Sequence, residues 1–156
     1  MSESNAAQSA QELDAIVVGA GFAGLYMLHR FKQLGLNARI LEAGGGVGGT
    51  WYWNRYPGIA CDVEAYSYLP LLEEMGYIPS MKFAGGFEIM EYCQSMATEF
   101  GFYDRCLFHT TVENTEWDEE SGRWTVRTDR GDAMRARYVV LANGILTTPK
   151  LARIEG

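Results

Sequence analysis

The sequence predicts an α/β fold with a parallel sheet and an inserted antiparallel β-meander. A short apolar run, residues 14–18, leads into three glycines and then into a segment whose apolar residues recur at helical spacing. A second apolar run, residues 38–41, follows that segment. From residue 107 onward, apolar and polar side chains alternate in runs separated by turn residues. The first pattern predicts a strand–helix–strand unit, and the second predicts antiparallel hairpins added to it.

The three glycines after the first run, Gly19, Gly21 and Gly24, have the spacing G-x-G-x-x-G, with Phe22 between them. Gly19 permits a sharp turn, Gly21 lets backbone N–H groups approach a pyrophosphate, and Gly24 lets the helix lie close to the strand. A bound anion would then lie at the helix N-terminus, where free N–H groups and the helix dipole favour negative charge. The pattern is typical of a Rossmann-like dinucleotide-binding fold, and a glycine-rich turn without a ligand is the alternative.

The helix and the next strand place an acidic residue at a suitable distance from these glycines. Gly35 ends the helix, and the strand of residues 38–41 ends at Glu42, which lies 42 − 21 = 21 residues beyond the middle glycine. Dinucleotide-binding folds place there the acid that binds ribose hydroxyls, and a solvated glutamate is the alternative. We expect His29 on the polar side of this helix. The apolar face of the helix is predicted to consist of Gly24, Met27, Leu28, Phe31 and Leu34.

Composition restricts the class of protein further. A chain of 156 residues fits one domain. Its net charge is −7, and the sequence has no cluster of basic residues that would bind nucleic acid. Residues 1–12 are polar and predict a disordered tail rather than a signal peptide, with the domain at residues 13–156. No run approaches the roughly 18 apolar residues of a membrane span. The cysteines, which have no C-x-x-C spacing, predict reduced thiols in a cytoplasmic protein and no metal site. They are Cys61, Cys93 and Cys106.

A second glycine-rich stretch follows Glu42. Five of the six residues 44–49 are glycines, which cannot make a regular element but let the backbone lie closely against something flat or charged. Three aromatic residues, Trp51, Tyr52 and Trp53, come directly after it. Two interpretations remain open. The loop is either anchored by buried indoles, or it crosses a cofactor and lays an aromatic ring against it.

The rest of the chain is predicted as an irregular segment, a helix and three strands. Pro70 and Pro79 break any helix in residues 69–83, and residues 88–100 form a helix that Gly101 ends. The strands are residues 108–117, which begin near His109, then 123–128 and 133–140.

The last strand becomes fully apolar at residues 138–141 and ends at Ala142-Asn143-Gly144. It is predicted to be a buried parallel strand that returns the chain to the crevice at the strand ends.

One string carries a specific resemblance. The sequence G-G-T-W-Y-W-N-R-Y-P-G at residues 48–58, with C-D-V-E at residues 61–64, is similar to the FAD-binding segment of Baeyer–Villiger monooxygenases. The resemblance extends from about Asp14 to the C-terminus and implies a two-dinucleotide-binding flavoprotein, incomplete at its C-terminal end. The family's F-x-G-x-x-x-H-x-x-x-W-P fingerprint does not occur in this sequence, and no second G-x-G-x-x-G for NADP follows the last predicted strand.

The resemblance implies site residues position by position. Glu42 corresponds to the ribose acid, Val112 to a residue on the adenine side, and Asp62 to an aspartate at the flavin edge, the one tentative catalytic residue. A carboxylate held in structural hydrogen bonds is the alternative for Asp62. Ala60 and Cys61, together with Asp62, correspond to a stretch near NADP. The implied FAD contacts are Gly19, Gly21, Phe22, Gly24, Glu42, Gly49, Thr50, Trp51, Asp62, Tyr68, Val112, Ala142, Asn143 and Gly144.

The resemblance also implies an activity for the intact enzyme. There, NADPH reduces FAD, and O2 then provides the oxygen atom that is inserted next to a ketone carbonyl, with FAD carrying the chemistry. A fragment of a flavin-containing N- or S-monooxygenase and a non-catalytic FAD-binding module remain alternatives. A separate chain that carries the NADP domain is a possible partner. For this chain alone we expect weak FAD binding at best and no NADPH-dependent oxygenation.

Overall fold

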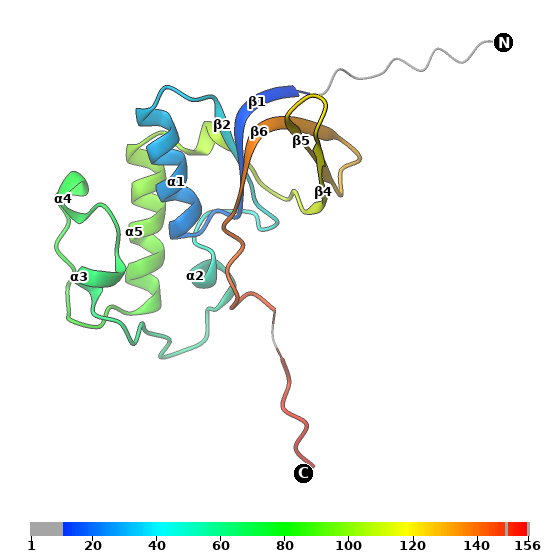
Figure 1. Cartoon of the computed structure of the whole chain (residues 1–156). Coiled ribbons are helices and arrows are strands. Elements are labelled where there is room, and N and C mark those ends of the chain that lie inside the picture. The colour runs from blue at the N-terminus through cyan, green and yellow to red at the C-terminus, as the bar shows by residue number, and fades with distance from the viewer. Residues whose placement is uncertain (1–10, 149, 156) are drawn as a thin grey trace.

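Six strands form one mixed sheet in the order β3-β2-β1-β6-β5-β4 (Figure 1). The structure, a computed structural model, describes residues 11–148 and 150–155. β1 pairs in parallel with both β2 and β6, β2 pairs in parallel with β3, and β4, β5 and β6 are antiparallel. The predicted parallel sheet with an antiparallel meander is therefore confirmed. The strands are β1 (Gln11–Val18), β2 (Ala38–Leu41), β3 (Cys106–Leu107), β4 (Val112–Asp118), β5 (Arg123–Thr128) and β6 (Ala133–Leu141).

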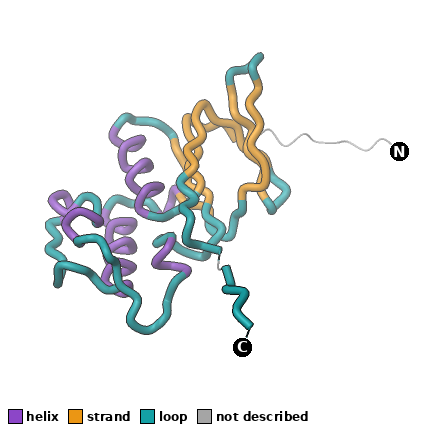
Figure 2. The backbone as a smooth tube through the Cα atoms, turned by 60° about the horizontal axis from the view of Figure 1, so that its bottom comes forward, coloured by secondary structure: helices purple, strands orange, loops and turns teal. Residues whose placement is uncertain are grey.

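Two long helices, α1 (Phe22–Gln33) and α5 (Gly86–Glu99), lie side by side against the parallel strands (Figure 1). Figure 2 shows the helices gathered on one side of the molecule and the strands on the other. In the part of the chain that the structure describes, no helix is both long enough and apolar enough to span a membrane. The short helices are α2 (Thr50–Trp53), α3 (Ala65–Tyr68), α4 (Leu72–Met75) and the 3-10 turn η1 (Tyr103–Arg105).

The two faces of the parallel sheet are buried by different partners. Val17 of β1 and Ile40 of β2 belong to a core cluster that includes Leu28 of α1. Their neighbours in sequence point to the opposite face because side chains alternate along a strand. There Ile16 belongs to a cluster that includes Val126 of β5. The meander thus covers part of the face that the helices leave open, and the centre of β1 is buried on both sides.

The buried face of α1 differs from the prediction, since it includes Leu25 and His29 and does not include Leu34. Leu34 is the C-cap residue and is 66% exposed. His29 is only 8% exposed, and its ring centroid lies 4.6 Å from that of Phe100. The predicted polar-side placement of His29 is therefore wrong, because the end of α5 covers it and Gln33 gives its ring nitrogen a polar neighbour at 3.0 Å. Gly35 follows the helix at φ 70°, as expected for a glycine that ends a helix.

Several boundaries also differ. β1 begins at Gln11, so residues 11 and 12 belong to the strand rather than to the predicted tail, and residues 1–10 lie outside the described part. α5 begins at residue 86 rather than at residue 88. The segment predicted as irregular contains α4, a single helical turn that begins two residues after Pro70.

The strand predicted to begin at residue 108 begins at Val112 instead. His109 has φ 51°, a left-handed conformation that interrupts an extended chain. The short strand β3 before it pairs with β2, whereas β4 after it pairs with β5. The left-handed residue therefore lies between the parallel and the antiparallel parts of the sheet.

The second half of β6 is parallel to β1 as predicted, but it is not buried. Tyr138 is 48% exposed and Leu141 is 69% exposed. The physical reason is the register, since β5 pairs with β6 only from Ala133 to Ala136. Beyond Ala136, among the described residues, β6 has a strand neighbour only on its β1 side.

Burial of two thiols predicts their reactivity. Desolvation raises the pKa of Cys93 from 9.0 to about 12, and that of Cys106 likewise to about 12. At about pH 8 we expect both to react with a thiol reagent only as fast as the protein unfolds, because the thiolate is the nucleophile. A Cys61→Ser variant leaves only these two thiols, so their reaction can be followed directly in absorbance.

The same burial links stability to pH. Unfolded thiols ionise near their ordinary pKa, whereas the folded ones stay protonated. Their contribution to stability is therefore complete below about pH 9 and is lost as the pH rises toward 12. In the labelling experiment, immediate reaction of Cys93 and Cys106 with the thiol reagent in the folded Cys61→Ser variant would contradict the burial of these two thiols.

Candidate functional site

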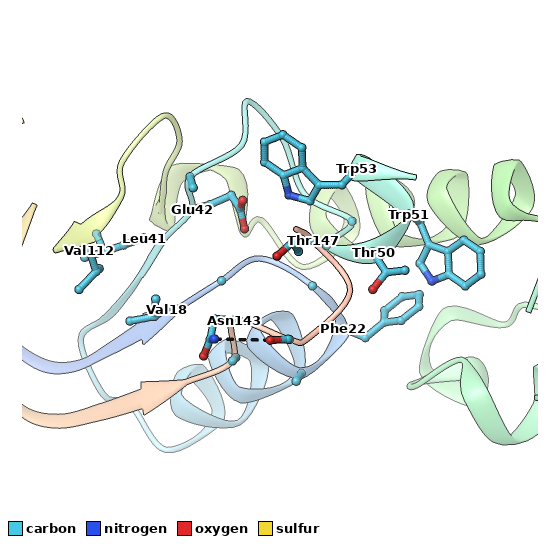
Figure 3. Close-up of a pocket in the computed structure, with 18 of the residues that line it drawn as sticks. Val18, Phe22, Leu41, Glu42, Thr50, Trp51, Trp53, Val112, Asn143 and Thr147 are labelled. Carbon is cyan, nitrogen blue, oxygen red and sulfur yellow. Dashed lines mark hydrogen bonds between the residues drawn. The ribbon is translucent and has the colours of Figure 1, made fainter. Parts of the chain in front are cut away.

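A cleft of about 580 Å³ opens at the carboxyl ends of β1, β2 and β6 (Figure 3). Val18, Leu41 and Ala142, at or just beyond the three strand ends, all line it. We call it the strand-end cleft. Ligands of open α/β sheets bind outside the carboxyl ends of the strands, so the fold itself marks this position.

The strand-end cleft brings together nearly all the residues that the sequence singled out. Of the implied FAD contacts, Gly24 and Asp62 lie elsewhere. The others come from segments far apart in sequence, and their convergence is a property of the fold. They are Gly19, Gly21, Phe22, Glu42, Gly49, Thr50, Trp51, Tyr68, Val112, Ala142, Asn143 and Gly144.

The three glycines of the first motif differ in their surroundings. Gly19 has φ 105°, and a Cβ added there would lie 2.5 Å from the carbonyl oxygen of Ala142. A Cβ on Gly24 would lie 1.9 Å from the carbonyl oxygen of Gly19, so this glycine sets the distance between α1 and β1. Gly21 has an ordinary φ of −77°, and a Cβ there would meet Gly49 Cα at 3.5 Å. The fold therefore does not demand a glycine at position 21, in contrast to positions 19 and 24.

The N-terminus of α1 forms part of the cleft wall and is left without a side-chain partner. Gly21 is the N-cap residue, and within the described chain no side chain caps it and no acidic residue lies in the first turn. Phe22 and Ala23, the first two helical residues, line the cleft. Unpaired N–H groups and the positive end of the helix dipole there favour an anion such as a phosphate.

Glu42 is buried rather than solvated, being only 6% exposed. Its Oε2 accepts a hydrogen bond of 2.7 Å from the backbone N–H of Ala20, and its Oε1 accepts one of 2.7 Å from that of Gly44. The alternative of a solvated strand end is therefore wrong. The carboxylate joins the end of β2 to the first glycine loop and still forms part of the cleft wall (Figure 3).

The second glycine-rich stretch lies directly on the first. The N–H of Gly48 donates to the carbonyl oxygen of Ala20 at 2.9 Å. A Cβ on Gly49 would lie 2.9 Å from Gly21 Cα, and Gly49 has φ 54°. The prediction of an irregular, closely packed loop is confirmed for residues 43–49, whereas the helical turn α2 that follows was not predicted.

The two tryptophans after this stretch fit different interpretations, one as a buried anchor of the loop and the other as an aromatic ring beside the cleft. Trp51 is 7% exposed, and its Nε1–H donates to Tyr68 Oη at 2.8 Å, so this indole anchors the loop. Trp53 is 47% exposed and lines the cleft. Phe22 meets Tyr68 edge to face at 5.6 Å, completing an aromatic wall. Burial raises the pKa of Tyr68, although the hydrogen bond from Trp51 opposes this, so its hydroxyl keeps its proton.

Asp62 lies in a different cavity, a neighbouring cleft of about 670 Å³ that Ala60 and Cys61 also line. The residues predicted to lie near NADP are therefore together, but they are set apart from the strand-end cleft. The two clefts share a wall formed by α2, Tyr68 and the segment after β6. The shared residues are Thr50, Trp51, Trp53, Tyr68, Thr147 and Thr148.

Sequence reasoning missed several residues that line the strand-end cleft. Thr110, which is 1% exposed, and Thr111 follow the left-handed His109 and lie between the sheet's two parts. They belong to no motif, and the alternating pattern predicts a strand at their positions. Thr147 and Thr148 come from the segment after β6, for which the sequence carried no signal.

The fold is Rossmann-like, and the family model described as an NAD(P)-binding Rossmann-like domain matches residues 17–75 of this chain. The chain is 49% identical to Baeyer-Villiger monooxygenase 4 of Dietzia sp. over 147 residues, which are 94% of this chain and 24% of that protein. Baeyer–Villiger monooxygenases are thus its homologues, and the resemblance seen in the sequence is confirmed.

Solved structures agree with this relationship. A polycyclic ketone monooxygenase from Thermothelomyces thermophila superposes with a TM-score of 0.85 at 42% identity, over 94% of this chain and 25% of that one. OTEMO in complex with FAD and NADP gives a TM-score of 0.85 at 33% identity, over 92% of this chain and 28% of that one. The chain spans about a quarter of the length of the proteins it matches.

Proposed function

We propose that the strand-end cleft binds FAD and that the chain forms the amino-terminal FAD-binding part of a Baeyer–Villiger-type monooxygenase. One observation carries the proposal. A free helix N-terminus, a buried carboxylate and an aromatic wall line a single cleft at the strand ends. These three features match the pyrophosphate, ribose and ring systems of a dinucleotide. The similarity to OTEMO, whose structure holds FAD and NADP, supports this choice of ligand.

The chain's own residues would hold the parts of FAD in order along the cleft. The loop at Gly21 and the first turn of α1 would bind the pyrophosphate, and Glu42 would accept hydrogen bonds from the adenosine ribose. Val112 would lie on the adenine side. At the other end Thr50 and Trp51, with Tyr68 behind them, would lie beside the flavin.

FAD, when bound, supplies the redox and oxygen chemistry, whereas the protein supplies binding and orientation. In the intact enzyme we infer NADPH-dependent insertion of one oxygen atom from O2 next to a ketone carbonyl. Ala60, Cys61 and Asp62, in the neighbouring cleft, would then form one side of the nicotinamide site. The remaining side would come from further sequence or from a separate chain. The three free cysteines fit a cytoplasmic location.

The test is to titrate the purified chain with FAD and with FMN, which lacks the adenosine half. We expect FAD to bind more tightly than FMN, because Glu42 would contact the adenosine that FMN lacks and the pyrophosphate loop would hold two phosphates rather than one. Bound flavin is measured by fluorescence quenching and by the shift of its visible absorbance. Failure to bind either flavin, or equal affinity for both, would overturn the proposal. Adding NADPH, O2 and a panel of ketones then tests oxygenation by this chain.

Substitution of Glu42 tests the ribose contact. A hydrogen bond to a charged group contributes roughly 1.5–3 kcal/mol, so Glu42→Gln should weaken FAD binding by about tenfold. Glutamine keeps a side-chain acceptor for one of the two backbone N–H groups, at Ala20 or at Gly44, whereas alanine keeps none. The measurement is the dissociation constant for FAD.

Glu116→Gln, on the exposed face of β4, is the matched control for this change. It should leave both flavin affinities unchanged. An unaltered affinity for FAD in the Glu42 variant would mean that this carboxylate serves only to join β2 to the glycine loop.

A further inference from the structure

The backbone of residues 44–46 passes across the ring of Tyr52. A Cβ on Gly44 would lie 2.8 Å from Tyr52 Cε1, and one on Gly46 would lie 3.3 Å from Cε2. The N–H of Gly45 donates to the Tyr52 hydroxyl at 2.9 Å. The flat object that three consecutive glycines accommodate is therefore a side chain of this same protein.

Tyr52 is itself held in place on other sides. The guanidinium carbon of Arg55 lies 4.7 Å from the centre of the tyrosine ring, and Arg55 Nε–H donates to the Tyr52 carbonyl oxygen at 2.7 Å. Trp53 meets the same ring edge to face at 5.0 Å. A ring fixed by these contacts can act as a rigid support for the loop above it.

His109 holds the loop at the same point. A Cβ on Gly45 would lie 2.7 Å from His109 Cε1 and 3.1 Å from Tyr52 Oη, so Gly45 is tightly enclosed by the two side chains. The backbone N–H of His109 donates to the carbonyl oxygen of Gly44 at 3.0 Å. This hydrogen bond from His109, a residue with a left-handed φ, orients the carbonyl group of Gly44.

The same loop orients the carboxylate of Glu42. The N–H of Gly44 donates to Glu42 Oε1 at 2.7 Å, and the other oxygen is fixed by Ala20. A Cβ on Gly44 would lie 3.1 Å from Glu42 Oε1 as well as 2.8 Å from the Tyr52 ring. Tyr52 therefore contacts the loop, and the loop contacts the carboxylate of Glu42. Tyr52 itself does not line the strand-end cleft.

We propose that Tyr52 is a positioning residue that fixes the carboxylate of Glu42 for the adenosine ribose, acting through the N–H of Gly44. The inference rests on the proposed binding of FAD in the strand-end cleft. Loss of the Tyr52 hydroxyl leaves Gly45 held on the His109 side alone, which loosens the adjacent peptide that orients Glu42. The adenosine half of the ligand should then bind less well, while the flavin half is unaffected.

The experiment measures FAD and FMN dissociation constants for Tyr52→Phe and Tyr52→Leu. Tyr52→Phe removes one hydrogen bond, so we expect FAD affinity to fall about three- to tenfold, with FMN affinity unchanged. Tyr52→Leu also removes the flat support and should have the larger effect. Tyr66→Phe, the same change at a tyrosine that is 62% exposed and lines neither cleft, should behave as wild type.

A double-mutant cycle separates positioning from a general structural role. In a Glu42→Gln background, Tyr52→Phe should cost less than about twofold in FAD affinity, because residues that act through one another are not additive. The same fold-loss in both backgrounds, an equal loss of FMN affinity, or no loss at all would overturn the inference. If the wild-type chain binds no FAD, the proposed function itself fails and the inference fails with it.

Discussion

Replacing Gly24 by alanine is expected to cost the protein more stability than any other single-methyl change in the first glycine motif. The new Cβ would lie 1.9 Å from the carbonyl oxygen of Gly19 and 3.0 Å from its carbonyl carbon. Both are backbone atoms, so rotating a side chain cannot relieve the contact.

The backbone around Gly24 has little freedom to move away. The N–H of Gly19 donates to the carbonyl oxygen of Leu41 at 2.8 Å, which fixes the loop to β2. Moving α1 outward instead would separate it from a core cluster that contains Val17 and Leu28. We therefore expect a loss of about 3 kcal/mol or more, at the upper end of the range for overpacked sites.

The measurement is the midpoint of urea or thermal unfolding. A loss of about 3 kcal/mol lowers the melting temperature of a domain of this size by roughly 6–12 °C. Gly85→Ala is the matched control, because Gly85 has φ −70° and no described atom lies within 4 Å of an added Cβ. If both variants melt at the wild-type temperature, α1 does not require the close approach that the structure gives it.

The first strand–helix–strand unit was predictable because each of its signals has a local cause. The turn at Gly19, the close approach at Gly24 and the burial of Val17 all follow from spacing within about ten residues. The same holds for the turns of the meander, where Gly122 and Gly131 have positive φ. Part of the strand-end cleft was also predictable, because Gly19, Glu42 and Ala142 follow strands whose carboxyl ends meet at one edge of the sheet. The aromatic part of the cleft was predicted only from the resemblance to Baeyer–Villiger monooxygenases.

The features that sequence could not supply depend on contacts between distant segments. His29 is buried only because the end of α5 lies over it, and the exposure of Leu141 depends on where pairing with β5 stops. The motif likewise predicts only a ligand-binding acid at Glu42. It does not predict that the carboxylate joins two loops. Asp62 lies one cavity away from the predicted site because Trp51 and Tyr68 form a wall between them.

Substitution of Gly21 should weaken FAD binding but cost little stability, whereas substitution of Gly24 costs stability. Gly21 has φ −77°, and a Cβ there would meet Gly49 Cα at 3.5 Å, an ordinary contact distance. The fold therefore tolerates alanine at this position. The new methyl group would stand beside the N-terminus of α1, where the pyrophosphate of FAD is proposed to bind.

Keeping the pyrophosphate away from the N–H groups removes charge-assisted hydrogen bonds, each worth roughly 1.5–3 kcal/mol. Loss of two such bonds corresponds to about a hundredfold or more in affinity, so Gly21→Ala should bind FAD poorly and Gly21→Val should not retain it. Flavin content after gel filtration and the dissociation constant for FAD are the measurements. Riboflavin, which has no phosphate, should bind the alanine variant and the wild type alike.

The control for this change must be a glycine at which alanine is harmless. Gly35 is unsuitable although it lies outside the loop, because its φ of 70° would strain any other residue. Gly85→Ala serves instead, and it should retain the wild-type affinity for FAD. Equal flavin content in Gly21→Val and Gly85→Ala would refute the pyrophosphate assignment. A Gly21→Ala variant that loses FAD only because its melting temperature collapses would instead show that position 21, like position 24, is set by the fold.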